Sequence, residues 1–136
     1  MSMMIQRRIK DTVEYTHQSS KVFPAAGEVT LTGAAGVNVQ GAAVVISAAL
    51  AANTKIESIC IYGLSAADRY TVNISTGAGA GTVVATVSIG GAIAATGTVP
   101  VNIPSIALGT RLVCSVASVS GGGDTCKIAI NYIEVV

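Results

Sequence analysis

The stretch RYTVNISTGAGAGTVVATVSI, residues 69–89, decides the fold class, because it has the pattern of two strands joined by a glycine-rich turn. Tyr70, Val72 and Ile74 alternate with polar residues, as in a strand that buries one face. After TGAGAGT the alternation resumes at Val83, Ala85, Val87 and Ile89. Glycine adopts the positive φ angles of tight turns. The stretch therefore predicts an antiparallel hairpin whose apolar residues face the core.

Short alternating runs continue upstream of this hairpin. They are EVTLT (28–32), VNVQ (37–40), the flatter AAVVISAAL (42–50) and KIESICIYG (55–63). In the last run, strict alternation places Ile59 and Ile61 on one face and Ile56 on the other. We therefore expect a strand that is covered on both faces.

Downstream, TVPVNIP (98–104) and TRLVCSVAS (110–118) read as the next pair of strands. Pro100 and Pro104 place the first of them at a sheet edge, since proline cannot donate a hydrogen bond to a neighbouring strand. SGGGD (120–124) is expected to close a final hairpin into TCKIAINYIEVV (125–136). Seven to nine short strands with glycine and serine turns predict an all-β fold, an antiparallel β-sandwich or jelly-roll-like domain, over residues 25–136.

Residues 1–24 form a segment of different composition, an N-terminal arm. It contains the single His, the single Phe and all three Met residues, and it ends at Pro24. Ile5, Ile9 and Val13 recur every four positions and would suit a short amphipathic helix. TVEYTHQSSKVF, however, is rich in β-branched and aromatic residues, which favours an extended arm. An extended arm of this length would reach past its own domain onto a neighbouring molecule.

Charge is scarce and unevenly placed. Charged residues make up 11% of the chain, against about 25% in an ordinary soluble domain. The first 28 residues hold seven of the fifteen. Such a body suits a protein whose surface is covered by other subunits, although a monomer kept soluble by hydroxyl and amide groups is the alternative. The net charge of +1 argues against broad capture of nucleic acid or an anionic membrane.

The sequence offers no catalytic or ligand-binding constellation that we would defend. GLSAA (63–67) has the form of a nucleophile elbow around Ser65, but a helix should follow it, and the one possible base is His17 in the arm. TGAGAG precedes a strand instead of the helix of a phosphate-binding loop. Asp124 is a single carboxylate where a calcium loop needs several oxygen ligands. We therefore predict no enzyme activity, no cofactor and no metal site.

Cysteine number and apolar run length bear on localisation. Cys60, Cys114 and Cys126 are odd in number and lack the spacing of a zinc site, which fits core thiols in a reducing cytoplasm. A bridge between Cys114 and Cys126 stays open as an alternative. The longest apolar stretch, GAAVVISAALAA, is shorter than the roughly 18 residues of a membrane span, and we expect no secretory signal.

The basic cluster QRRIK lies on the arm and carries the site prediction. We expect Arg7, Arg8, Lys10 and Phe23 to contact a partner protein, because a basic group on an arm pairs with acidic patches as the arm docks. A solvated, frayed terminus is the alternative.

A charged arm before an Ala-, Thr- and Gly-rich sandwich resembles the small decoration, or cement, proteins of tailed-bacteriophage heads. The resemblance is one of style, carried by ALAANTKIESICIYGL (49–64), YTVNISTGAGAGTVVATVSI (70–89) and GTRLVCSVASVSGGGDTCKIAINYIEVV (109–136). It implies a virion protein, made in the host cytoplasm, that binds the major capsid protein outside the assembled head. It also implies a homo-oligomer, with a trimer favoured. A phage tail, fibre or cell-surface adhesin domain that reads a receptor through its loops is the alternative.

Overall fold

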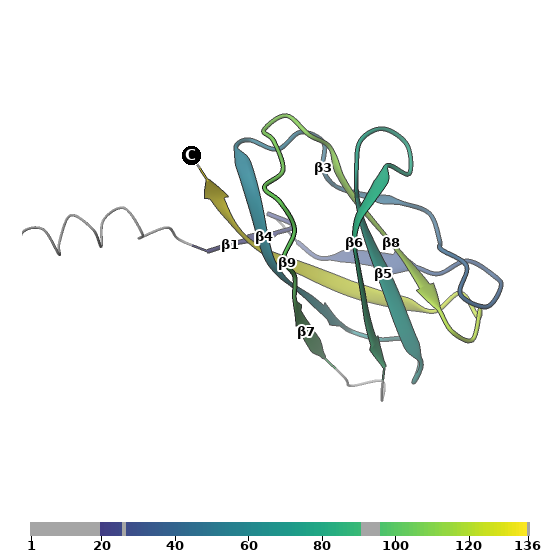
Figure 1. The fold of residues 1–136 in the computed structure, drawn as a ribbon. Coiled ribbons are helices and arrows are strands. Elements are labelled where there is room, and N and C mark those ends of the chain that lie inside the picture. Colours follow the sequence, from purple (N-terminus) through teal and green to yellow (C-terminus); the bar gives the residue numbers. More distant parts are fainter. Residues whose placement is uncertain (1–19, 26, 91–95, 136) are drawn as a thin grey trace, which may run out of the picture.

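The computed structural model describes residues 20–25, 27–90 and 96–135, and these residues form nine strands and no helix (Figure 1). The strands, in chain order, are β1 (Lys21–Phe23), β2 (Val29–Thr32), β3 (Val44–Ser47), β4 (Asn53–Tyr62), β5 (Arg69–Thr76), β6 (Thr82–Gly90), β7 (Gly97–Pro100), β8 (Leu112–Ser118) and β9 (Thr125–Val135). In the described part of the chain, no helix is long and apolar enough to cross a membrane.

The strands form two antiparallel sheets that pack face to face (Figure 1). One sheet has the order β1-β9-β4-β7, with β2 also paired to β9, and the other has the order β3-β8-β5-β6. We call them the β9 sheet and the β8 sheet. The predicted fold class, an all-β antiparallel sandwich, is confirmed.

The core lies between the two sheets. Tyr70, Val72 and Ile74 of β5 are fully buried, and they meet the alternating residues of β9 and β8. The predicted hairpin is the β5–β6 pair. Its turn contains Gly77, Gly79 and Gly81, all with positive φ. The alternation of small and branched side chains thus builds the two inner faces, as expected for a sandwich.

A β-bulge corrects the predicted facing of β6. Ile74 pairs with Ala85, but Ser75 pairs with Val83, so Val84 has no partner in the register. An extra residue reverses the side to which the preceding residues point. Val83 therefore does not line up with Val87, and it is 49% exposed. The prediction that Val83 faces the core is wrong, because strict alternation ends at the bulge.

A second bulge corrects the prediction for β4. Ile56 pairs with Tyr132 and Ser58 pairs with Asn131, which leaves Glu57 unpaired. Ile56 therefore points to the core together with Ile59 and is fully buried. The opposite face of β4 is only half-buried. β4 is not covered on both faces.

The glycine-rich segment between β8 and β9 crosses from one sheet to the other. β8 pairs with β3 and β5, whereas β9 pairs with β1, β2 and β4. The predicted hairpin at SGGGD (120–124) is therefore wrong, because turn residues suit an arch between layers as well as a hairpin within one sheet.

Two further pairings differ from expectation. β7 pairs with β4, so residues 98–104 and 110–118 do not form the predicted pair. The run VNVQ (37–40) is not a strand, although the amide of Asn38 donates to the carbonyl of Ser118 at 3.0 Å. The edge position inferred from Pro100 is confirmed, since β7, which contains Pro100, is the last strand of its sheet.

The predicted arm overlaps the sandwich at its C-terminal end. Lys21–Phe23 forms β1 and pairs with β9, with Lys21 opposite Tyr132 and Phe23 opposite Ile130. Residues 1–19 lie outside the described residues. The boundary at residue 24 therefore stays a prediction, with three residues of the predicted arm placed in the sheet.

Candidate interaction surfaces

The outer face of the β8 sheet is free of charged side chains along almost its whole extent. Val113 of β8 pairs with Val45 on one side and with Ser75 on the other, and directly paired residues point to the same face. Following this register, the face has Arg69 at one end and otherwise consists of Val45, Thr71, Asn73, Ser75, Val83, Thr86, Ser88, Val113, Ser115 and Ala117. Ser75, Val113 and Ala117 are themselves buried, and the others are at least partly accessible. We call this surface the uncharged face.

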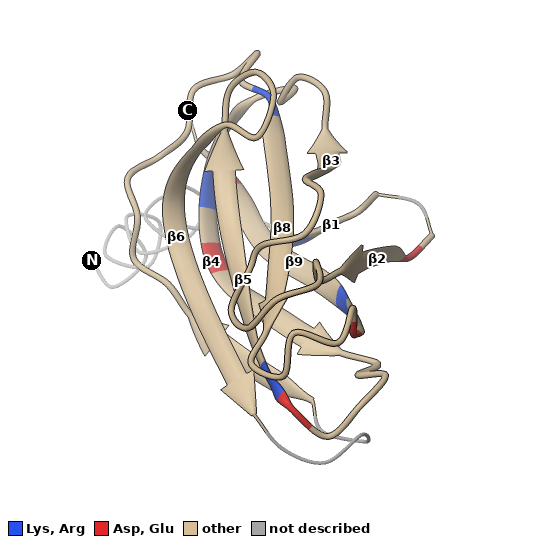
Figure 2. Cartoon of the chain, turned by 90° about the vertical axis from the view of Figure 1, so that its right-hand side faces the viewer, with Lys and Arg blue, Asp and Glu red and all other residues tan. Residues whose placement is uncertain are grey.

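Ionic residues are concentrated elsewhere in the described chain. In the four strands of the β8 sheet the single charged residue is Arg69, at the first position of β5. The strands of the β9 sheet contain five, namely Lys21, Lys55, Glu57, Lys127 and Glu134. Figure 2 views the molecule from the side of the β8 sheet, and the strands facing the reader are uncharged over nearly their whole length. The strands of the β8 sheet therefore contain far fewer charged residues than the strands of the β9 sheet.

Polar groups of the uncharged face bond to one another across strands. The hydroxyls of Thr71 and Ser88 lie 2.9 Å apart, and Thr86 Oγ1 donates to Asn73 Oδ1 at 2.8 Å. Covering a polar group costs free energy when the group loses its hydrogen-bond partner. The cost is small when the partner lies on the same surface and the bond is kept. Apolar Val45 and Val83, 42% and 49% exposed, flank these pairs. The face is therefore suited to contact with protein.

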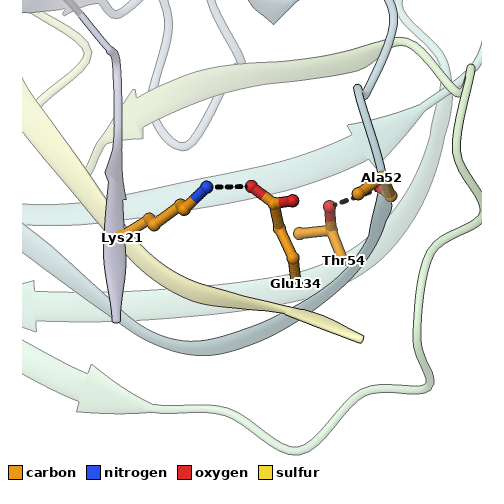
Figure 3. A network of polar contacts seen from close by, with 4 residues as sticks. All are labelled: Lys21, Ala52, Thr54 and Glu134. Carbon is orange, nitrogen blue, oxygen red and sulfur yellow. Dashed lines mark hydrogen bonds and ion pairs between the residues drawn. The ribbon is translucent and has the colours of Figure 1, made fainter. Parts of the chain in front are cut away.

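A small pocket of about 210 Å³ lies at the end of the sandwich where β1 and β9 meet the loop before β4. Its walls are mostly alanine methyl groups and the rings of Phe23 and Tyr132, which stack with centroids 4.0 Å apart. Glu134 lies at the pocket and is ion-paired with Lys21 (Figure 3). Thr54 Oγ1 donates to the carbonyl of Ala52 at 2.9 Å. The polar groups drawn in Figure 3 are therefore engaged within the chain.

The ion pair at this pocket changes the pKa of Lys21. The bond and the charge of Glu134 raise the pKa of Lys21 above its ordinary value of 10.5. The ammonium group therefore stays protonated at neutral pH. Its stabilising contribution is present below the unfolded-state pKa and is lost as the pH rises through the folded-state pKa.

Of the four predicted contact residues, Phe23 falls within the described part of the chain. Its ring is half-buried and stacks on Tyr132 of the same domain. Arg7, Arg8 and Lys10 lie outside the described residues. A contact between these four residues and a partner stays a prediction.

Ser65, the candidate nucleophile, is held as a structural residue. Its Oγ accepts a hydrogen bond from the amide of Thr125 at 2.8 Å, and its own amide donates to the carbonyl of Thr125 at 2.9 Å. These two bonds tie the loop after β4 to the start of β9.

Cys114 and Cys126 face the shared core from opposite sheets, and both are free thiols. Burial is the main cause that raises the pKa of each thiol to about 12, and the nearby Cys126 adds to the effect at Cys114. They remain neutral at physiological pH and act as small apolar side chains. Among the described residues, no group of three or more His, Cys, Asp or Glu is placed to bind a metal.

Side chains tie down the turns at both ends of β5. Arg111 Nη1 donates to the carbonyls of Gly77 and Gly79 in the β5–β6 turn, at 3.1 and 2.8 Å. At the segment after β8, Asp68 Oδ2 accepts from the amide of Ser120 at 2.9 Å. The pKa of Asp68 is lowered from its ordinary value of 3.8, and hydrogen bonding from Ser120 is the largest cause.

Comparison with known proteins adds one structural likeness. No family model and no curated protein matches the chain. Among solved structures it is similar to a chain in the structure of infectious bursal disease virus Gx strain, with 14% sequence identity and a TM-score of 0.42. The match covers 87% of this chain and 32% of that chain, so this chain spans about a third of that chain's length.

Proposed function

We propose that the chain is a non-enzymatic structural protein of a bacteriophage virion, a decoration protein that binds the outside of the assembled head and bridges capsomers. The observation that carries the proposal is the uncharged face, whose seven accessible residues come from four strands and whose single charged neighbour in those strands, Arg69, lies at one end. Charged side chains are depleted where protein interfaces are fully covered. A face of this kind suits permanent contact with protein.

Such a protein would act by mass action. A ligand that binds the assembled shell and not its free subunits stabilises the shell in proportion to its affinity and concentration. We propose a homotrimer as the working form, since several weak contacts made together bind much more tightly than one. The major capsid protein is the proposed partner.

The N-terminal segment supplies the second proposed contact. Arg7, Arg8 and Lys10 would pair with acidic groups of the capsid protein, and Phe23 is the fourth proposed contact residue. The chain enters the sandwich at β1, on the edge of the β9 sheet. The segment that contains the basic residues is therefore connected, through the chain, to the sheet that does not carry the uncharged face.

Binding to purified, expanded, empty phage heads tests the proposal. We expect saturable binding at symmetric positions, visible by electron microscopy. Val45→Lys adds a charge to an exposed position of the uncharged face and should weaken binding at least tenfold. Thr32→Lys, at an exposed position of β2 in the other sheet and opposite uncharged Thr125, is the matched control. Equal binding by both variants would remove the uncharged face from the proposal, and no binding by any form would overturn it.

Removal of residues 1–19 tests the arm separately. This truncation keeps β1 and its pairing with β9, so the sandwich should fold as before. We expect most of the affinity for heads to be lost. Unchanged affinity of the truncated protein would exclude the arm as a contact.

A further inference from the structure

The edge strands of the sandwich differ in how they are protected against pairing with another chain. β7 has four residues and ends on Pro100, and β1 has three residues and begins with Lys21. β3 has four residues and an irregular register between Val45 and Ser47. Short length, proline, lysine and irregular pairing are the features that natural proteins use to block edge-to-edge association.

β6 lacks most of this protection. It is nine residues long, contains no proline and no charged residue, and lies at the end of the β8 sheet with β5 as its one neighbour among the described strands. Its bulge at Val84 disturbs the first part of the strand. From Ala85 to Gly90 the register with β5 is regular, and the other edge of this segment, about 20 Å long, has no partner strand among the described residues.

The side chains along this regular edge are compatible with pairing to the same edge of a second copy of the chain. In an antiparallel pair, directly opposed residues lie on the same face. A two-fold axis at Val87 would set Thr86 opposite Ser88 of a second copy, and Ala85 opposite Ile89. Hydroxyl groups then oppose hydroxyl groups on the outer face, and apolar groups oppose apolar groups on the inner face. No like charges meet, because the strand has none.

We propose that the β6 edge pairs with the β6 edge of a second copy of this chain, antiparallel and about a two-fold axis, so that the two β8 sheets form one continuous eight-stranded sheet. A second copy is the proposed partner because the pattern of Ala85–Ile89 is neutral and complementary to itself. In this register Val84, 36% exposed, lies opposite Gly90 of the second copy. The pairing also joins the two uncharged faces into one wider surface.

This contact is independent of the proposed role on a phage head and of the proposed trimer. A two-fold contact links two single chains or two larger oligomers, so it doubles the mass of whichever unit carries it. A contact along one short strand edge should bury less area than a standard protein interface, which covers about 800 Å² per partner. We therefore expect reversible, concentration-dependent association.

Sedimentation of the full chain over a wide concentration range tests the pairing. The wild type should show reversible doubling of mass. The variant Thr86→Lys/Ser88→Lys places like charges opposite one another at exposed positions, and its dissociation constant should rise at least tenfold. Thr32→Lys/Thr98→Lys adds the same charge to two exposed positions of the β9 sheet, opposite uncharged Thr125 and Cys60, and should associate like the wild type.

Hydrogen exchange on the unmodified protein gives a second measurement that needs no variant. Amides within residues 85–90 should exchange more slowly at concentrations at which the mass doubles, and amides of β7 should not change. Absence of doubling, or doubling without protection of β6, would overturn the proposal. So would equal association of the β6 variant and the Thr32→Lys/Thr98→Lys control. Since none of these measurements uses phage heads, their failure is distinct from failure to bind a shell.

Discussion

Phe23 and Tyr132 stack face to face, with ring centroids 4.0 Å apart and an interplanar angle of 10°. The pair joins β1, the first described strand, to β9, the longest one. Aromatic pairs contribute about 0.5–1.5 kcal/mol beyond the area that they bury. This stack therefore holds the short strand β1 to the sheet from which the N-terminal segment departs.

Phe23→Ala should lower the free energy of unfolding by about 2 kcal/mol, because it removes both the stack and a half-buried ring. Val22→Ala is the matched control, since Val22 is 48% exposed and precedes Phe23 in the same strand. It should lower the free energy of unfolding by well under 1 kcal/mol. Urea denaturation measures both, and equal losses would show that the stack contributes nothing.

Gly121→Ala should destabilise the fold by at least about 2 kcal/mol. Gly121 has a φ of 72°, and a Cβ placed there would lie 2.4 Å from the carbonyl carbon of Gly36. The substitution therefore adds a backbone clash to the strain of a left-handed conformation. Gly109→Ala is the control, since its φ is 80° and nothing lies within 4 Å of a Cβ there.

The control should show about 1 kcal/mol of strain without the clash. The difference between the two alanine variants, measured by thermal unfolding, isolates the close approach between the β8–β9 segment and Gly36. If both variants lose the same stability, then the two backbones are not in contact in solution.

Alkaline pH should destabilise the fold through Cys114 and Cys126. Burial raises the pKa of each thiol to about 12 from 9.0, so between these values the unfolded chain releases a proton that the folded chain keeps. Stability then falls as the pH rises, by about 1.4 kcal/mol per pH unit for each thiol. Below pH 9 the two thiols should give no pH dependence.

Comparison of the wild type with Cys114→Ala isolates this effect. Lys21 and Lys127 also lose their ion pairs at high pH, but they do so equally in both proteins. The slope of unfolding free energy against pH from 9 to 12 should be shallower in the variant by about 1.4 kcal/mol per unit. Identical slopes would mean that Cys114 is accessible to solvent in the folded state.

The β5–β6 hairpin could be predicted because its information is local. Tyr70, Val72 and Ile74 alternate with polar residues, and glycines mark the turn, so pattern and turn chemistry agree. The segment from Ser120 to Asp124 has the same turn chemistry but links different sheets. Which strand β9 joins depends on packing against residues distant in the sequence, and no local signal contains that.

Composition indicated an exterior poor in charge, but not where the uncharged part lies. Its position depends on the register that sets Val45, Val113 and Ser75 side by side, and that register contains bulges. Three of the four predicted contact residues, Arg7, Arg8 and Lys10, belong to the basic cluster near the N-terminus. Nothing in the sequence distinguished Thr86 or Ser88 from other hydroxyl residues until β6 was placed at the sheet edge.

Deletion of Glu57 should leave the fold intact. Glu57 is the unpaired residue of the β4 bulge, and without it Ile56, Ser58 and Ile59 follow strict alternation with both isoleucines toward the core. The expected loss is about 1 kcal/mol, from the hydrogen bond that the amide of Val101 donates to the carbonyl of Glu57 at 3.0 Å.

Deletion of Cys60 provides the contrast, because it removes a residue from the regular part of β4. Ile59 and Ile61, both fully buried, would then become adjacent and point to opposite faces. One of them would leave the core, and we expect no cooperatively folded protein. Circular dichroism and thermal unfolding of the two deletion variants measure the difference. A folded Cys60 deletion, or an unfolded Glu57 deletion, would contradict the register of β4 on β9.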